Sequence, residues 1–262
     1  MIEERIDKII LKLFPKYTRS KIQTLIAKGK VFYKKENRWI KVTKSSHKLP
    51  LSDIKQIDWK FEQDEEMNYV SRGALKLKEA VEKFQIPVKG TLCLDIGLST
   101  GGFSDYLLQE GAKKILGIDV GREQLHSSLR EIPELLWKDK INGREELSKE
   151  LLADFFQKEE KSKFDLIVID VSFISLDKIV THLHKYIDEK GSIIALVKPQ
   201  FELSRSDLNK KGVVKDFSLI NQVLQKISRV LSENKLELKA ECSSPIEGDN
   251  GNKEVLILAQ PT

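Results

Sequence analysis

The N-terminal part of the chain shows helical spacing of its apolar residues first and alternation afterwards. Apolar side chains three and four positions apart predict an amphipathic helix over 4–14. A second helix is expected to begin after Thr18 as its N-cap and to end at Gly29, where glycine is favoured. The segment 31–42 then alternates between apolar and polar residues, which is typical of a β-hairpin.

From residue 69 onward, apolar strands alternate with amphipathic helices. Helices are predicted at 71–84, 103–110, 122–130, 145–157 and 175–188. Strands are predicted at 91–97, 115–120, 135–141, 164–171 and 192–198. Such alternation is typical of an α/β fold with a parallel sheet covered on both faces. A helix at 217–233 and strands at 235–242 and 253–259 complete the pattern. No helix separates the last two strands, so we expect one to run antiparallel at the end of the sheet.

This change of pattern predicts two domains. A chain of 262 residues is long enough for one or two, at about 150 residues per domain. We expect a small α+β domain over 1–60, an acidic polar linker over 61–68, and an α/β domain over 69–262.

The charge distribution follows the same division. Residues 1–60 hold 16 Lys and Arg against 6 Asp and Glu, a net charge of +10, whereas the rest of the chain carries −5. A basic segment joined to an acidic body suggests that the basic part binds nucleic acid. The alternative is a lysine-rich solvated surface, because lysine is common throughout this chain.

Composition excludes several classes of protein. Two cysteines are too few for a disulfide framework. The longest uncharged apolar stretch, 192–197, is too short to span a bilayer, and the N-terminus has acids where a signal peptide would be basic. The four histidines show no spacing that suggests a metal site. We therefore expect a soluble, cytoplasmic protein without a metal.

Glycine and charged residues mark the carboxyl ends of several predicted strands. The first strand of the α/β domain ends in D-I-G-L-S-T-G-G-F, residues 95–103, which is not the dinucleotide fingerprint G-x-G-x-x-G. The next strands end in Asp119, Asp170 and Lys198. Because the carboxyl ends of parallel strands meet at one edge, these groups predict a ligand site, with Asp119 placed to hold a ribose diol. The alternative for the glycines is a tight strand-to-helix turn.

Several long motifs resemble the TlyA family. These are Y-V-S-R-G-A-L-K-L (69–77), D-I-G-L-S-T-G-G-F (95–103), D-L-I-V-I-D-V-S-F-I-S-L (165–176), L-V-K-P-Q-F-E (196–202), K-G-V-V-K-D (211–216) and S-P-I-E-G-D-N-G-N-K-E (244–254). R-I-D-K-I-I-L and T-R-S-K-I-Q-T-L-I-A-K-G-K-V resemble the small RNA-binding domain of a small-subunit ribosomal protein and of many pseudouridine synthases.

The resemblance implies a fold and an activity. TlyA proteins are S-adenosylmethionine-dependent ribosomal RNA 2′-O-methyltransferases, historically also labelled haemolysins, and their catalytic domain is similar to FtsJ-type ribose methyltransferases. It implies a class I, Rossmann-like methyltransferase domain preceded by an RNA-binding domain. The expected cofactor is S-adenosylmethionine, the expected partner is ribosomal RNA or a ribosomal subunit, and the expected target is a cytidine ribose.

The resemblance also assigns a catalytic tetrad. A ribose hydroxyl is a poor nucleophile, so its attack needs proton removal and a stabilised alkoxide. FtsJ-like enzymes use Lys-Asp-Lys-Glu, which falls here on Lys76, Asp170, Lys198 and Glu254. Lys198 is the expected base, Lys76 would steady the oxyanion, Asp170 would orient Lys198, and Glu254 would fix the hydrogen bonds. Glu247, in the same loop, competes with Glu254.

Binding residues follow from the same motifs. The expected contacts to S-adenosylmethionine are Asp95, Gly97, Ser99, Thr100, Gly101, Gly102, Phe103, Asp119 and, near the adenine, Asp139. RNA is expected to contact Arg5, Arg19, Lys21, Lys28, Lys30 and Arg72. At 139–144 the chain keeps Asn142 and Arg144 of the family pattern, while Lys140 and Ile141 replace Arg and Thr.

Two other functions compete with the methyltransferase. One is a noncatalytic RNA-binding factor in ribosome assembly that has kept the fold. The other is a membrane-active haemolysin, after the family's label. The intact tetrad counts against the first, and the absence of an apolar or strongly amphipathic lytic helix counts against the second.

Overall fold

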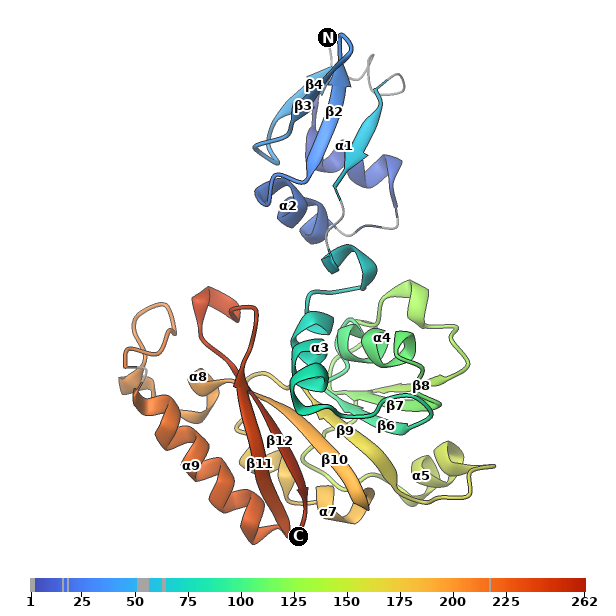
Figure 1. The fold of residues 1–262 in the computed structure, drawn as a ribbon, viewed down its shortest axis with the longest axis vertical. Helices are drawn as coiled ribbons and strands as arrows, with labels where there is room; N and C mark the ends of the chain where they lie inside the picture. The colour runs from blue at the N-terminus through green and yellow to red at the C-terminus, as the bar shows by residue number, and fades with distance from the viewer. Residues whose placement is uncertain (1–2, 16, 18, 51–56, 63–64, 217) are drawn as a thin grey trace. The chain divides into compact units, whose positions relative to one another are not determined.

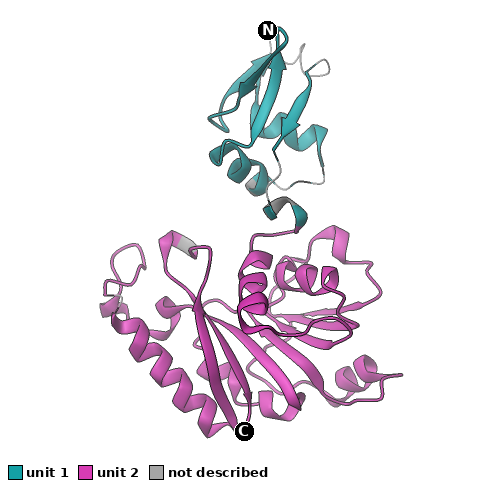
Figure 2. Ribbon diagram, viewed as in Figure 1, with its two compact units in different colours: residues 1–68 teal, residues 69–262 magenta. Residues whose placement is uncertain are grey.

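The computed structural model describes residues 3–15, 17, 19–50, 57–62, 65–216 and 218–262. Its contacts divide the chain into unit 1, residues 1–68, and unit 2, residues 69–262 (Figure 2). Strand β5 (Trp59–Phe61) spans the predicted boundary at residue 60, and the short 3₁₀ helix η2 (Glu65–Asn68) follows it. The segment expected to be a linker therefore begins inside a strand of unit 1.

The described residues of unit 1 form an α+β fold of two α-helices and short strands. Its elements are β1 (Glu3–Arg5), α1 (Ile6–Leu13), α2 (Arg19–Ala27), β2 (Val31–Lys35), β3 (Arg38–Lys41), β4 (Lys48–Pro50) and β5. Among the described residues, β3, β2 and β5 form one antiparallel sheet in that order, and β1 pairs with β4. The apolar faces of both helices are buried against this sheet, as the helical spacing predicted.

Turn chemistry confirms the predicted ends of two elements in unit 1. Gly29 closes α2 with φ +67°, while the N–H of Lys30 donates to the carbonyl of Leu25. The hairpin turns at Glu36 and Asn37, which both have positive φ, as a two-residue turn between twisted strands requires. Thr18, the predicted N-cap of α2, lies outside the described residues.

Seven strands form the sheet of unit 2 within the described part of the chain. They are β6 (Leu92–Ile96), β7 (Lys114–Asp119), β8 (Leu135–Asp139), β9 (Phe164–Ile169), β10 (Ile187–Val197), β11 (Leu236–Ser243) and β12 (Val255–Pro261). The order is β11-β12-β10-β9-β6-β7-β8, with β10, β9, β6, β7 and β8 parallel. The antiparallel strand is β12, inserted between β10 and β11 rather than placed at the end of the sheet as predicted.

Helices cover both faces of this sheet (Figure 1). The helices are α3 (Gly73–Phe84), α4 (Gly102–Gln109), α5 (Lys149–Phe156), α6 (Asp177–Val180), α7 (Leu183–Tyr186), α8 (Pro199–Glu202) and α9 (Ser218–Glu233), with single 3₁₀ turns at η3 (Ser127–Leu129), η4 (Arg205–Asp207) and η5 (Asp249–Gly251). Successive residues of β6 face opposite cores: Leu92 and Leu94 belong to the cluster that also holds residues of α9, whereas Cys93 belongs to the cluster of α3 and α4.

One predicted helix is wrong, and another is divided into two short helices. The segment 122–130 forms only the turn η3, because Glu123 has a left-handed φ of +53° that a helix cannot contain, and its N–H donates to Asp139 Oδ2. The predicted helix at 175–188 is divided into α6 and α7, and its last residues belong to the eleven-residue strand β10.

Candidate functional site

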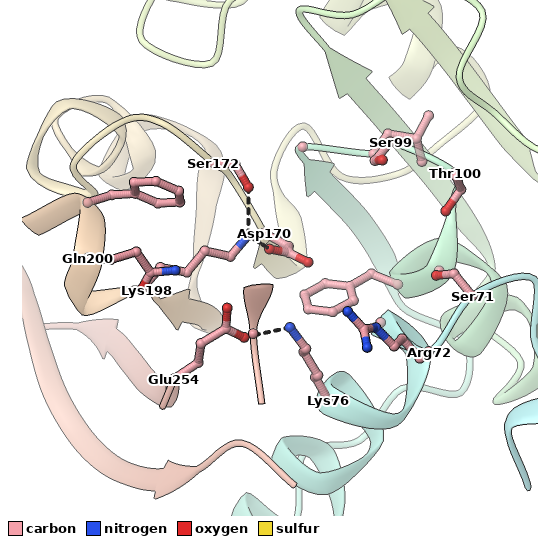
Figure 3. Close-up of a pocket in the computed structure, with 17 residues that line it drawn as sticks. Ser71, Arg72, Lys76, Ser99, Thr100, Asp170, Ser172, Lys198, Gln200 and Glu254 are labelled. Atoms are coloured by element: carbon pink, nitrogen blue, oxygen red, sulfur yellow. Dashed lines mark hydrogen bonds and ion pairs between the residues drawn. The ribbon is translucent and has the colours of Figure 1, made fainter. Parts of the chain in front are cut away.

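A cavity of about 310 Å³ lies at the carboxyl edge of the parallel strands (Figure 3). Its walls come from the start of α3, the glycine turn after β6, the end of β9, the start of α8 and the loop before β12. The lining residues include Ser71, Arg72, Lys76, Gly97, Ser99, Thr100, Gly102, Phe103, Asp170, Ser172, Lys198, Gln200, Phe201, Gly248 and Glu254. All four residues of the predicted tetrad therefore meet in one cavity.

The four charged residues form two ion pairs. Lys76 Nζ donates to Glu254 Oε2 over 2.5 Å, and both side chains are almost completely buried. Lys198 Nζ lies 2.6 Å from Asp170 Oδ1, but its aligned hydrogen bond goes to Ser172 Oγ at 2.8 Å. The carboxylate of Asp170 thus acts on the Lys198 ammonium by charge, while Ser172 fixes its direction.

Sheet register places Asp170 beside Lys198. Strands β9 and β10 are parallel neighbours, and Ala195 pairs with Ile169. Asp170 is the first residue after β9, and Lys198 is the first after β10. Two residues that are 28 positions apart in sequence therefore leave the sheet side by side. Pro199 then starts α8 directly after Lys198, which turns the chain away from the sheet.

The loop before β12 selects Glu254 rather than Glu247. Glu254 lines the cavity and is 4% exposed, whereas Glu247 is exposed and is not among the lining residues. Gly248 makes room for the carboxylate, because a Cβ there would lie 2.0 Å from Glu254 Oε1.

The glycine turn packs against two strand ends. Gly97 has φ +91°, and a Cβ there would lie 2.3 Å from the backbone oxygen of Asp170. The N–H of Gly97 donates to Ile118 O, and the N–H of Ser99 donates to Asp119 Oδ2 over 2.7 Å. A glycine is thus required where the turn passes the end of β9, and Asp119 holds the turn in place.

Two predicted cofactor contacts point into the protein instead. Asp95 is fully buried and accepts a hydrogen bond from Ser104 Oγ, and burial raises the pKa of its carboxyl to about 7. A Cβ on Gly101 would lie 2.5 Å from Leu129 Cδ1 and 2.7 Å from Leu125 Cδ1. Neither residue is among those that line the two cavities described here, and both are packed inside the protein.

A second cavity of about 740 Å³ adjoins the first. Both cavities are lined by Gly97, Ser99, Asp170, Ser172 and Phe201. The second continues over the end of β7, where its lining residues include Ile118, Asp119, Val120, Ile141, Asn142 and Gly143. A carboxylate between apolar walls suits a nucleoside, because the carboxylate can accept hydrogen bonds from a ribose diol.

Asp139 was assigned to the adenine side, and the structure places it elsewhere. It is not among the lining residues of the second cavity, and its Oδ2 accepts a hydrogen bond from the N–H of Glu123 over 2.6 Å. The residues that line that side are Ile141, Asn142 and Gly143. The carboxylate instead holds the loop after β7.

An aromatic pair at the cavities was missed by the sequence analysis. Phe173 is 89% exposed, has φ +64°, and lies with its ring centre 5.1 Å from that of Phe201. A left-handed phenylalanine exposed to solvent is unfavourable on two counts, the backbone conformation and the exposed apolar ring. The motif V-S-F-I-S was visible in the sequence, but the exposure of its Phe was not.

In unit 1, a buried carboxylate organises two of the predicted RNA contacts. Asp7 is fully buried and accepts hydrogen bonds from Arg5 and Arg19. Burial would raise the pKa of Asp7, but hydrogen bonds from Arg5, Gln23 and Arg19 outweigh it and lower that pKa to about 2. The sequence analysis did not single out Asp7, because a negatively charged side chain is not expected to contact RNA.

The remaining predicted RNA contacts lie in different settings. Lys30 is 3.7 Å from Glu62, and the Lys21 ammonium lies 5.7 Å from the centre of the Tyr17 ring. Lys28 follows the end of α2 and is exposed. Arg72, in unit 2, lines the first cavity beside Lys76.

The described part of the chain holds no cluster of three or more His, Cys, Asp or Glu side chains that could bind a metal ion. Within the same residues, no helix has the length and apolar character needed to cross a membrane.

Comparisons with known proteins agree with this geometry. Residues 69–260 match the family model of FtsJ-like methyltransferases. Hemolysin A of Brachyspira hyodysenteriae is 37% identical over 91% of this chain and 92% of its own length. The 16S/23S rRNA (cytidine-2′-O)-methyltransferase TlyA of Mycobacterium tuberculosis is 37% identical over 74% of this chain and 69% of its own. A solved structure from Streptococcus thermophilus, described as a hemolysin candidate, superposes with a TM-score of 0.73 at 32% identity, covering 100% of this chain and 90% of that one.

Proposed function

The chain belongs to the FtsJ-like methyltransferase family, and we propose that it methylates the ribose 2′-hydroxyl of a cytidine in ribosomal RNA. The TlyA relative is named for this reaction on ribosomal RNA. The observation that carries the proposal is the meeting of the Lys76–Glu254 and Lys198–Asp170 pairs in the first cavity, which shares Asp170 with the second.

The second cavity and the glycine turn fit S-adenosylmethionine. When bound, this cofactor supplies a methyl group activated by a sulfonium. Asp119 would hold the ribose hydroxyls, and the turn from Gly97 to Phe103 would hold the methionine end, with Ser99, Thr100 and Gly102 lining the first cavity. The carboxylate of Asp170 borders both cavities. The positive charge of a sulfonium held between the cavities would therefore lie near this carboxylate.

Lys198 is placed to accept the proton of the ribose hydroxyl. Only a neutral lysine can do so, and the geometry suits the task because Ser172 fixes the direction of its nitrogen. Asp170 contacts the same nitrogen, so the Lys198 side chain is held in place at the end of β10. The role of Asp170 is orientation, since it contacts the nitrogen of Lys198 from the neighbouring strand end.

Lys76 supplies a second positive charge in the same cavity. Its ammonium is anchored by the buried carboxylate of Glu254, so it cannot swing away from the site. An anchored cation stabilises the negative charge that develops on the ribose oxygen without first having to reorient. Arg72, one turn before it, lines the same cavity and is suited to a phosphate of the target strand.

Phe173 and Phe201 offer a surface for the target base. Chemistry on a nucleotide within folded RNA requires that nucleotide to leave its stack, which costs a few kcal/mol. An exposed aromatic ring beside the cavity restores part of the lost stacking. Phe173 belongs to the same loop as Asp170 and Ser172, so this surface lies beside the two residues that hold Lys198.

Unit 1 would dock the enzyme on ribosomal RNA through its basic residues. The excess of +10 charges in residues 1–60 favours a polyanion, and such contacts give affinity without reading sequence. Ribosomal RNA as substrate also implies that the protein works in the cytoplasm. A noncatalytic assembly factor would need the RNA-binding residues but not the four buried or half-buried charges of unit 2.

The proposal is tested on Lys198. Lys198→Ala should lower the single-turnover rate of methyl transfer about a hundredfold, the usual contribution of a positioned base. Lys198→Arg should be no better, because a guanidinium keeps its proton. Lys190→Ala, an exposed lysine on the same strand, serves as the matched control. The rate is measured by transfer of a labelled methyl group to ribosomal RNA, and the product is located by mass spectrometry.

The outcomes separate the competing functions. A wild-type protein that binds ribosomal RNA but transfers no methyl group would favour the noncatalytic factor. A Lys198→Arg protein with a near-normal rate would exclude Lys198 as the base and leave Lys76 and Glu254 to be examined.

A further inference from the structure

The outer face of the sheet in unit 1 carries rows of aromatic and basic side chains. In the first row Phe32 of β2 pairs with Lys41 of β3 on one side and with Lys60 of β5 on the other. In the second row Trp39 of β3 pairs with Lys34 of β2. Directly paired residues share a face of a sheet, so these five side chains lie on the same face.

The other face of the sheet forms the core of unit 1. Val31 and Tyr33 of β2 are buried there, and Ile40 and Trp59 pack against them. The outer row is therefore not needed to close the core. The aromatic side chains on the outer face need another explanation, because a strand buried on one face usually carries polar residues on the other.

Phe32 fixes two of the lysines in space. The ammonium of Lys41 lies 5.9 Å from the centre of the Phe32 ring, and that of Lys60 lies 5.6 Å from it. Both distances are within the range of cation–π attraction. The charge of Lys34 is balanced by Asp58, whose carboxylate lies 3.5 Å away. The positive charge of this face therefore comes from Lys41 and Lys60. Two cations are thus held on either side of one strand.

Trp39 gives this face an exposed ring. It is 46% exposed, which makes it one of the few large apolar side chains at the surface of the described residues. An indole ring beside lysines combines base stacking with phosphate attraction, the combination used by sheets that bind single-stranded RNA. A duplex would not offer its base faces to the ring, and an apolar protein surface would have to desolvate the lysines.

We propose that this face binds an unpaired segment of RNA, with Trp39 stacked on a base and Lys41 and Lys60 contacting phosphates. The surface is distinct from the Arg5–Asp7–Arg19 cluster of β1, α1 and α2, which is joined by side-chain hydrogen bonds. The inference rests on the proposed function for the identity of the polymer, and it adds the class of RNA structure that unit 1 recognises.

The test compares substitutions in the full-length protein. Trp39→Ala should weaken binding of a single-stranded ribosomal RNA oligonucleotide roughly tenfold, the effect of losing one stacked base. Trp39→Phe should restore most of the affinity, because phenylalanine keeps an aromatic face. Leu13→Ala, which removes an apolar side chain of unit 1 that is 39% exposed, is the matched control and should change nothing.

Salt dependence separates the stacking ring from the cations. Trp39→Ala should leave the slope of log K against log salt unchanged, whereas Lys41→Gln and Lys60→Gln should each reduce it by about 0.7, the value for one phosphate of a single strand. The same oligonucleotide annealed to its complement should bind Trp39→Ala and wild type equally well.

Several results would overturn the inference. These are an unchanged affinity of Trp39→Ala for the single strand, a loss that is equal on single strand and duplex, or a loss that Trp39→Phe does not restore. Methyl transfer by the wild type is measured in parallel. If the wild type methylates ribosomal RNA while Trp39→Ala binds the single strand normally, this inference fails alone. If the wild type neither binds nor methylates RNA, the proposed function fails with it.

Discussion

At the scale of single residues, Asp95 shows that a motif residue can serve the fold rather than the ligand. It belongs to the glycine-turn motif, yet it is fully buried at the end of β6. One carboxylate oxygen accepts from Ser104 Oγ, and the other has no hydrogen-bond partner. Burial raises its pKa to about 7, which the charges of Asp170 and Asp119 reinforce.

This raised pKa predicts a dependence of stability on pH. In the unfolded chain Asp95 releases its proton near pH 3.8, whereas in the folded protein it holds the proton up to about pH 7. Stability therefore falls as the pH rises through this window and changes no further above it. Between pH 5 and pH 8, the free energy of unfolding of the wild type should fall by about 3 kcal/mol more than that of Asp95→Asn, whose amide does not titrate. Urea unfolding at both pH values measures the difference, and parallel curves would contradict the prediction.

Gly248 predicts the effect of a single added methyl group. Its Cβ would lie 2.0 Å from Glu254 Oε1, so Gly248→Ala should displace the carboxylate and release Lys76. We expect methyl transfer to slow roughly tenfold or more, because one stabilising group is misplaced. Gly90→Ala is the control, since its Cβ would meet nothing within 4 Å and it lies outside the cavity. Equal rates for the two variants would mean that the Lys76–Glu254 pair is dispensable.

At the scale of elements, Glu202 joins α8 to the loop after β9. Its side chain is 2% exposed and accepts hydrogen bonds from Ser175 Oγ, the N–H of Leu176 and Lys226 Nζ of α9. Helix α8 also carries Phe201, and the loop carries Ser172 and Phe173. One buried carboxylate thus ties together the segments that present the base-stacking pair and the Lys198 partner.

Glu202→Gln should therefore act on catalysis without touching the reacting groups. Losing the charge at this junction lets the loop and α8 shift, and a shift of about 1 Å can slow a reaction as much as a hundredfold. Glu146→Gln, which breaks an exposed ion pair with Lys185, is the matched control and should leave the rate unchanged. The two variants are compared by single-turnover methyl transfer and by urea unfolding. An unchanged rate with reduced stability would assign Glu202 to the fold alone.

At the scale of the whole molecule, the two units have separate cores. Each hydrophobic cluster of the described residues lies entirely in unit 1 or entirely in unit 2. The charge is divided in the same way, with the basic excess in residues 1–60. Separate cores favour separate folding, so docking and catalysis can be tested apart.

Removing residues 1–68 should leave a folded, cofactor-binding fragment with weak RNA affinity. The loss of phosphate contacts should also reduce the slope of log K against log salt by about 0.7 to 0.9 for each contact removed. Calorimetry with S-adenosylmethionine checks the first expectation, and RNA titration at several salt concentrations checks the second. A fragment that binds and methylates ribosomal RNA as well as the full chain would remove the docking role of unit 1.

The local pattern of the sequence determined most of the elements. Strand and helix periods depend on side-chain spacing along the chain, so the parallel strands, the helices α3, α4 and α9, and the hairpin of unit 1 could be predicted. The tetrad residues were identified by their motifs, and register then placed them in one cavity. The helix expected at 122–130 failed because Glu123 takes a left-handed conformation and its N–H donates to Asp139 at the end of β8, a contact that spacing does not reveal.

Only the tertiary structure decided which side chains face the ligand cavities. Gly101 and Asp95 belong to the same motif as Gly97 and Ser99. Yet Asp95 is buried, and Gly101 is packed against Leu125 and Leu129. The exposure of Phe173 and the insertion of β12 between β10 and β11 were equally invisible. The physical reason is that burial, pKa and the direction of a side chain depend on segments that are distant in sequence, whereas periodicity reports only neighbours along the chain.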